Sequence, residues 1–241
     1  MSKAPDIKAA ADTALQDIRA NYEFIKEQIA EAMDKAGRKD KVRIMAVTKT
    51  VATDKINYAE SLGIDLLGEN RVQEFLGKYE NYSENSEIHF IGGLQNNKVK
   101  YIIDKVRMIH SVDSIKLAEE INRRALSKNI TMDILLEVNI GNELSKGGFT
   151  DIELSEAAKT IAELRNVRIR GLMTIPPPLE GEYYFPRMQE LYENLRNGEN
   201  ALNGMDTLSM GMSGDYAAAV KYGSNIVRIG SGLFGYRNYT I

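Results

Sequence analysis

The stretch Val42 to Val51, V-R-I-M-A-V-T-K-T-V, decides the fold of this chain. Most of its first six residues are apolar, and the run has the length expected for a strand buried on both faces. Lys49 follows directly, where a parallel strand would end. A lysine at that boundary either extends its amine to water or is placed for chemistry, because ligands of α/β sheets and barrels bind at the carboxyl ends of the strands.

The same pattern recurs along the rest of the chain. Short apolar runs lie near residues 42–48, 64–68, 88–92, 107–112, 132–139, 167–173, 206–210 and 226–230. Helix-patterned segments separate them, at 54–62, 71–79, 96–105, 114–128, 152–164, 183–201 and 215–222. Strands that alternate with helices indicate right-handed parallel crossovers. Eight such units predict a closed (β/α)8 barrel of the α/β class, with a doubly wound open sheet as the alternative.

Residues 1–37 precede this pattern and are predicted to form an additional helix that packs on the outside of the barrel. Apolar residues at spacings of three or four line one face of it, namely Leu15, Ile18, Tyr22, Ile25, Ile29 and Met33. Gly37 suits a left-handed helix end. No linker or low-complexity tract interrupts the sequence, so residues 1–241 are predicted to form a single domain.

The composition narrows the functional classes. Lys and Arg number 31 against 34 Asp and Glu, a balance that argues against nucleic-acid binding through a basic face. The chain has no cysteine and two histidines, so we expect no metal site. Both histidines, His89 and His110, lie within strand-like runs and are expected in the core. Neither a signal-peptide core nor a membrane-spanning run is present, and we therefore expect a cytoplasmic protein without membrane contact.

Two Gly- and Ser-containing stretches near the end of the chain indicate an anion site. Gly230-Ser231-Gly232 follows the last predicted strand, and Ser213 follows the one before it. Barrels commonly hold phosphate with these two loops, where backbone N–H groups can approach an anion closely. The alternative is that the same residues serve only as helix caps and tight turns.

Arg228 is the second unusual residue of the last strand. Because strand residues alternate between faces, an outward Ile229 places Arg228 inside the barrel. An inward arginine needs a partner. That partner is either an internal carboxylate, such as Glu69 or Glu137, or a bound ring or anion. The two glutamates could also act together as an acid–base pair.

Taken together, the strand ends resemble one known family, the pyridoxal-phosphate homeostasis proteins, whose barrel is similar to the N-terminal barrel of alanine racemases. The resemblance covers nearly the whole chain after the first helix. It rests on A-V-T-K-T (46–50), G-E-N-R-V-Q-E (68–74), H-F-I-G-x-L-Q-x-N-K (89–98), I-H-S-V-D-S (109–114), E-V-N-I (137–140), G-L-M-T-I-P-P (171–177), L-S-M-G-M-S (208–213) and V-R-I-G-S-G-L-F-G (227–235), where x marks a position that does not count toward the resemblance.

This resemblance implies a fold-type III barrel that carries pyridoxal 5′-phosphate (PLP). Lys49 matches the lysine that forms the Schiff base with the cofactor, and Arg228 would face the pyridine nitrogen. Asn70 would lie beside the ring, and Ser213, Gly230 and Ser231 would hold the phosphate. An arginine at the ring nitrogen weakens the cofactor as an electron sink.

The resemblance implies a protein that holds PLP for intracellular vitamin B6 homeostasis, with little or no turnover, and that passes the cofactor to PLP-dependent apo-enzymes. Racemases of this fold add a C-terminal β-domain that supplies a catalytic tyrosine and builds the dimer. The chain ends at Ile241, shortly after the last strand. We therefore expect no such domain and a monomer. The alternatives are a PLP-dependent racemase-like enzyme and a barrel enzyme that acts on a phosphosugar or through a Schiff base without the cofactor.

Overall fold

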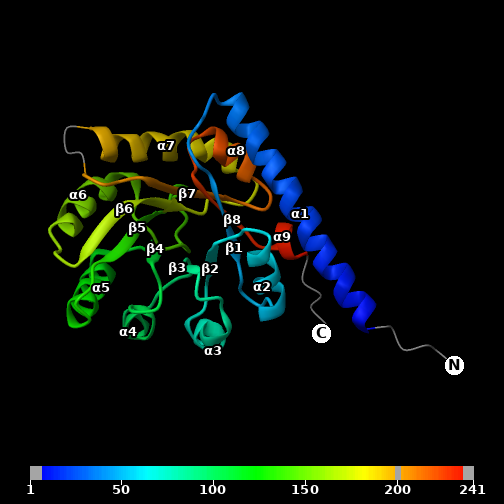
Figure 1. The fold of residues 1–241 in the computed structure, drawn as a ribbon. Helices are drawn as coiled ribbons and strands as arrows, with labels where there is room; N and C mark the ends of the chain where they lie inside the picture. The colour runs from blue at the N-terminus through cyan, green and yellow to red at the C-terminus, as the bar shows by residue number, and fades with distance from the viewer. Residues whose placement is uncertain (1–6, 199–201, 236–241) are drawn as a thin grey trace.

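The computed structural model describes residues 7–198 and 202–235, and these form a closed barrel of eight parallel strands surrounded by helices (Figure 1). Each strand pairs with the next in the sequence, and β8 pairs with β1. The predicted (β/α)8 barrel is confirmed, and the open-sheet alternative is wrong. The strands are β1 (Arg43–Val47), β2 (Leu66–Glu69), β3 (Glu87–Phe90), β4 (Met108–Val112), β5 (Met132–Val138), β6 (Val167–Thr174), β7 (Thr207–Met212) and β8 (Ile226–Ile229).

Eight of the nine α-helices in the described part of the chain lie at the predicted segments, whereas the short last helix, Ser231–Phe234, is not predicted from the sequence. The nine are α1 (Ile7–Lys35), α2 (Thr53–Ser61), α3 (Val72–Lys78), α4 (Val99–Ile102), α5 (Ile115–Ser127), α6 (Asp151–Ala162), α7 (Gly181–Asn197), α8 (Tyr216–Lys221) and α9 (Ser231–Phe234). The helix predicted over 96–105 is shorter than expected, because its first residues form a 3₁₀ turn, Asn96–Lys98. Asparagine is a poor helix former, which accounts for the late start of α4. The last three residues of the helix predicted over 183–201 lie outside the described residues.

The long α1 helix packs along the outside of the barrel, beside α8 and α9 (Figure 1). Its predicted apolar face is buried at Ile18, Tyr22, Ile25 and Ile29. The side-chain amide of Asn21 donates a hydrogen bond of 3.0 Å to the carbonyl of Leu233 in α9. Because α9 directly follows β8, α1 holds the segment that carries Ser231.

The strand residues separate into an outer and an inner set. Alternate residues face the helices and join the main hydrophobic core, while the others face the barrel axis. Apolar inward residues form two small clusters, one around Met45 and Leu66 and the other around Leu135. Among the polar residues buried within the strands are His89 and His110, which are 1% and 0% exposed. The prediction that both histidines lie in the core is confirmed.

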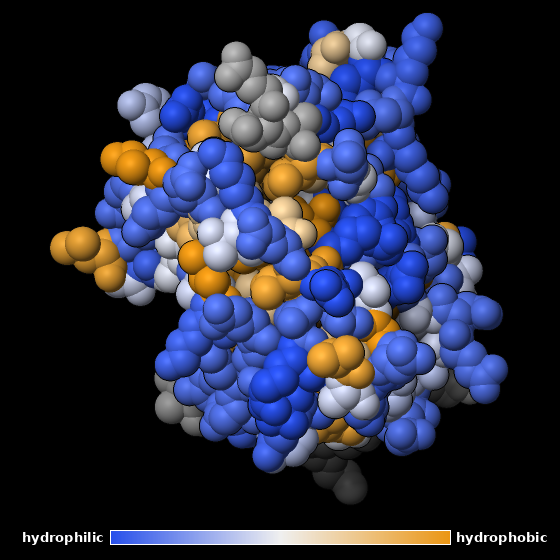
Figure 2. Space-filling model, turned by 90° about the vertical axis from the view of Figure 1, so that its left-hand side faces the viewer, coloured by the Kyte–Doolittle hydropathy of each residue, from blue (hydrophilic) through white to orange (hydrophobic). Residues whose placement is uncertain are grey.

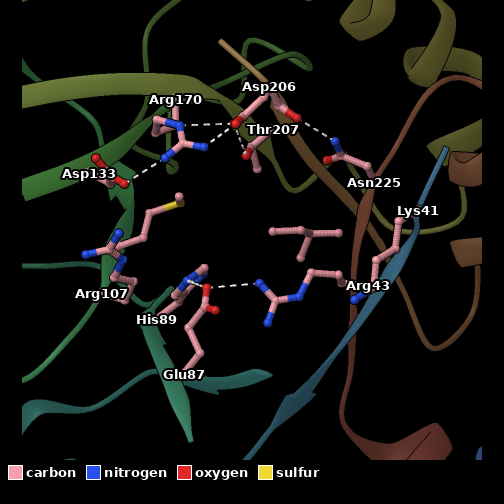
Figure 3. A pocket seen from close by; sticks show the side chains of 12 residues that line it. Lys41, Arg43, Glu87, His89, Arg107, Asp133, Arg170, Asp206, Thr207 and Asn225 are labelled. Atoms are coloured by element: carbon pink, nitrogen blue, oxygen red, sulfur yellow. Dashed lines mark hydrogen bonds and ion pairs between the residues drawn. The ribbon is translucent and has the colours of Figure 1, made fainter. Parts of the chain in front are cut away.

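Ion pairs line the amino-terminal mouth of the barrel around a cavity of about 360 Å³ (Figure 3). Arg43 contacts Glu87 at 2.9 Å, and Arg170 bridges Asp133 and Asp206. These charges link four strands and the loop before β7, and the amino-terminal end of such barrels generally serves stability.

The outer surface is largely hydrophilic on the side shown in Figure 2, with smaller hydrophobic areas between the polar residues. Within residues 7–198 and 202–235, no helix is both long and apolar enough to cross a membrane.

Candidate functional site

A second cavity, of about 480 Å³, lies at the carboxyl ends of the strands. This volume is within the range of small-molecule sites, about 300–1,000 Å³. The six residues that the sequence analysis selects all line it: Lys49, Asn70, Ser213, Arg228, Gly230 and Ser231. The remaining lining is mainly apolar and consists of Val47, Ile91, Ile175, Met212 and Gly214. Residues from six strands or the loops after them, far apart in the sequence, therefore meet around one space.

Lys49 lies in a tight turn immediately after β1. The next residue, Thr50, has a φ of +62°, an unfavourable conformation for a branched side chain. Its backbone N–H donates to Glu74, and the Lys78 amine donates to the carbonyl of Thr48 at 2.9 Å. Because Glu74 and Lys78 both belong to α3, this helix holds the turn that presents Lys49.

Asn70 follows β2 and is held by a close backbone approach. A Cβ atom at Gly92 would lie 2.2 Å from the carbonyl oxygen of Asn70, so only glycine fits at position 92. The Asn70 Oδ1 atom is buried and has no hydrogen-bond partner among the described residues. An unsatisfied buried amide that faces a cavity suits a polar group of a ligand.

The two loops with Gly and Ser are joined directly. The backbone N–H of Gly232 donates to Ser213 Oγ at 3.0 Å, which links the turn after β8 to the loop after β7. The latter loop is fixed in turn by Asp215, which accepts a 2.6 Å hydrogen bond from the backbone N–H of Met212. Gly230, Ser231 and Ser213 thus form one side of the cavity.

Arg228 points into the barrel, as strand alternation predicts, and is 4% exposed. Its Nη1 donates to the carbonyl and the hydroxyl oxygen of Ser209, at 2.8 and 2.7 Å, and its Nη2 donates to the carbonyl of Thr174 at 2.8 Å. Burial lowers the pKa of Arg228 to about 10, against the opposing field of Glu137, so the guanidinium stays charged near neutral pH.

The guanidinium of Arg228 is taken up by Ser209 and Thr174, so the predicted alternative of an ion pair with Glu69 or Glu137 is wrong among the described residues. Glu69 instead faces the surrounding helices, where it accepts hydrogen bonds from Thr48 Oγ1, at 2.6 Å, and from Tyr82. The neighbouring Gly68 faces inward, against the Met45 side chain, and alternation sends the Glu69 side chain outward.

The predicted acid–base pair of Glu69 and Glu137 is also wrong, because the two carboxyl groups lie on opposite faces of the barrel wall. Glu137 is on the inner face of β5, two residues after the inward Leu135. Burial, together with the charge of Asp113, raises the pKa of Glu137 to about 7.

Sequence reasoning does not find the residues that support the site. Ser209 and Thr174, which hold Arg228, lie within segments that carry the resemblance but are given no role there, and Lys78, which holds the Lys49 turn, lies outside those segments. A usable signal exists only for Ser209, a polar residue at an inward position of a buried strand.

The comparisons with known proteins agree with this geometry. The family described as alanine racemase, N-terminal domain, matches residues 15–238. The pyridoxal phosphate homeostasis protein of Aquifex aeolicus is 45% identical over 219 residues, which is 88% of this chain and 95% of that protein. The protein of the same name from Escherichia coli is 35% identical over 94% of this chain and 99% of its own length.

Among solved structures, PipY of Synechococcus elongatus with PLP bound superimposes with a TM-score of 0.74. The alignment has 31% sequence identity and covers 86% of this chain and all of PipY. The barrel described above is therefore the fold of a relative that has been seen with PLP.

Proposed function

Because the chain belongs to the pyridoxal phosphate homeostasis protein family, we propose that it holds PLP as a Schiff base on Lys49 and serves PLP homeostasis. The observation that carries this proposal is the convergence of Lys49, the Gly230-Ser231 turn and Arg228 on one cavity. A lysine, an anion-binding turn and a fixed cation suit the aldehyde, the phosphate and the ring nitrogen of PLP.

The rest of the lining also fits this cofactor. Val47, Ile91 and Ile175 offer apolar surface to an aromatic ring. Asn70 would lie beside the ring, and its unsatisfied Oδ1 is available for a polar contact there. Ser213, Gly230 and Ser231 would hold the phosphate, which accepts hydrogen bonds from hydroxyl and backbone N–H groups.

The environment of Arg228 supports retention of the cofactor over turnover. Bound PLP supplies an aldehyde that reacts with amines and a ring that withdraws electrons. Arg228 keeps its charge near neutral pH and is held by three hydrogen bonds. A cation at the ring nitrogen disfavours protonation of that nitrogen, which reduces the electron withdrawal that amino-acid chemistry needs.

On this basis we propose a carrier of PLP with little or no catalytic activity. We propose in addition that it acts as a monomer in the cytoplasm and passes the cofactor to PLP-dependent apo-enzymes. A transfer assay tests the last step. The PLP-loaded protein is mixed with a PLP-dependent apo-enzyme, and a phosphatase is added to remove any free PLP. The apo-enzyme should regain its activity under these conditions. Failure of the apo-enzyme to regain activity would contradict delivery, although binding would stand.

The binding itself is tested by titrating dialysed protein with PLP and following the absorption of the bound cofactor. We expect saturable binding by the wild type and a loss of at least tenfold in affinity for Lys49→Ala. Lys116→Ala is the matched control, because Lys116 is an exposed lysine of α5 that does not line the cavity. Equal affinities for the two variants would contradict the role of Lys49.

A further inference from the structure

A continuous series of hydrogen bonds runs through the centre of the barrel, from Arg228 to the opposite mouth. Ser209 Oγ lies 2.7 Å from Arg228 Nη1 and 3.2 Å from His110 Nδ1. His110 Nε2 lies 2.8 Å from His89 Nδ1, and His89 Nε2 lies 2.8 Å from Glu87 Oε1. The series therefore joins the cavity that contains Lys49 to the ion-paired cavity that Glu87 and His89 line (Figure 3).

Each hydrogen bond in this series has one permitted direction. A guanidinium only donates, so Ser209 Oγ accepts from Arg228. At the other end an ionised carboxylate only accepts, so each neutral imidazole donates toward Glu87 through Nε2 and accepts through Nδ1, and His110 Nδ1 accepts the proton of Ser209 Oγ. His110 then carries its proton on Nε2 and donates to His89 Nδ1. His89 in turn carries its proton on Nε2 and donates to Glu87, which accepts as a carboxylate. Donation thus runs one way, from the guanidinium at one end to the carboxylate at the other.

The electrostatics of the two histidines and Glu87 agree with that direction. Burial lowers the pKa of both histidines, and that of His110 falls well below its ordinary value, so both imidazoles are neutral. The hydrogen bond from His89, with that from Arg43, lowers the pKa of Glu87 to about 2 and keeps it ionised. A neutral imidazole has one donor and one acceptor nitrogen, as each position requires.

We propose that Ser209 and His110 are positioning residues for Arg228, which fix its guanidinium toward the cavity through the series that ends at Glu87. Neither residue lines that cavity, so neither acts on a ligand directly. Both lie at the buried centre of the barrel, where apolar side chains could fill the space without the cost of burying polar groups. The role assigned to them rests on the proposed function, in which Arg228 faces the ring of PLP.

The series itself is tested without any cofactor. Since the chain contains two histidines, the ¹⁵N spectrum of the imidazoles of the apo-protein has two side chains to assign. We expect both to be neutral at pH 7, with the proton on Nε2 and a bare Nδ1. A proton on Nδ1 of His110, or a charged imidazole, would overturn the assigned direction.

The positioning role is tested by the affinity for PLP and by the absorption spectrum of the bound cofactor. Ser209→Ala removes the only hydroxyl that bridges Arg228 and His110 in the described part of the chain, and we expect a roughly tenfold loss of affinity and a shifted absorption band. Ser209→Thr keeps the hydroxyl and should restore both. Ser224→Ala is the matched control, because Ser224 is also 0% exposed and hydrogen-bonded but lies outside the series.

The outcomes separate the two proposals. If the wild type binds PLP and Ser209→Ala behaves as Ser224→Ala does, the positioning role is overturned and the proposed function stands. If the wild type binds no PLP, the proposed function fails and the role of Ser209 toward the cofactor fails with it. If Ser209→Ala does not fold, two other measurements still test the positioning role. They are the ¹⁵N spectrum of the wild type and the affinity of Ser209→Thr for PLP. A loss of affinity in Ser209→Thr, which retains the hydroxyl, would overturn the role.

Discussion

The backbone N–H of Gly232 donates a hydrogen bond to Ser213 Oγ at 3.0 Å, and this contact joins the ends of β7 and β8 into one wall of the cavity. The pair is packed closely, since a Cβ atom at Gly232 would lie 3.1 Å from Ser213 Oγ. The two loops predicted separately from the sequence therefore form a single unit, and a change in one loop should affect the cavity as a whole.

A negative charge in this unit should weaken PLP binding. Ser231→Asp places a carboxylate where we propose that the phosphate lies, and like charges repel strongly at short range. We expect a loss of affinity of at least tenfold in a titration with PLP. The matched control is Ser83→Asp, at an exposed serine that does not line the cavity, and an unchanged affinity for Ser231→Asp would remove Ser231 from the site.

Gly171 in β6 should tolerate no side chain. Its φ is +153°, and a Cβ atom would lie 1.7 Å from the carbonyl oxygen of Thr207 in β7, so the strands would have to separate. Gly171→Ala should lower the free energy of unfolding by about 3 kcal/mol or more. Gly77→Ala in α3, where no atom lies within 4 Å, should raise it by about 0.5–1 kcal/mol. Denaturant unfolding measures both, and equal stabilities would contradict the predicted clash.

Glu87 should make the stability of the protein sensitive to acid. Its pKa is about 2 in the folded protein against an ordinary 4.5, so the folded state holds the carboxylate in its charged form. The stabilisation is fully present above the ordinary value and is lost as the pH falls from about 4.5 toward 2. Denaturant unfolding should therefore find Glu87→Gln less stable than the wild type at pH 7, with a smaller difference at pH 3.

Glu84→Gln serves as the control for this measurement, because Glu84 is exposed and precedes β3. Its difference from the wild type should be small at both pH values. If the difference in the free energy of unfolding between Glu87→Gln and the wild type is the same at pH 7 and pH 3, the charge of Glu87 does not stabilise the protein in the predicted way.

The protein should show little or no turnover of free amino acids. Arg228 remains charged beside the cavity, which opposes the electron withdrawal that racemisation requires. Incubation of the holo-protein with each enantiomer of alanine, followed by chiral chromatography, should give no conversion above that of free PLP. Conversion that Lys49→Ala abolishes would favour the racemase-like alternative.

The order of the strands and the residues at their carboxyl ends could be predicted from the sequence, because both depend on local patterns. The apolar run at 42–48 and the lysine after it predict a strand and a polar residue at its end. The inward direction of Arg228 follows from its neighbour Ile229, which is 0% exposed and joins the outer core.

The partners of those residues could not be predicted, because they depend on how neighbouring strands align. Arg228 is satisfied by Ser209 and by the carbonyl of Thr174 in β6, and no local pattern relates residues 228 and 174. Glu69 resembles a site residue by its position after Gly68, yet its side chain lies among the helices. Likewise, the close approach of Gly92 to Asn70 is set by the packing of two loops.

The most direct test of the central claim is reduction of the PLP-loaded protein with borohydride, followed by mass spectrometry of its peptides. A Schiff base on Lys49 predicts a loss of the visible absorption band and one modified peptide, the one that contains Lys49, whereas Lys116→Ala should be labelled like the wild type. A labelled peptide elsewhere, or full labelling of Lys49→Ala, would contradict the assignment of Lys49 as the residue that holds PLP.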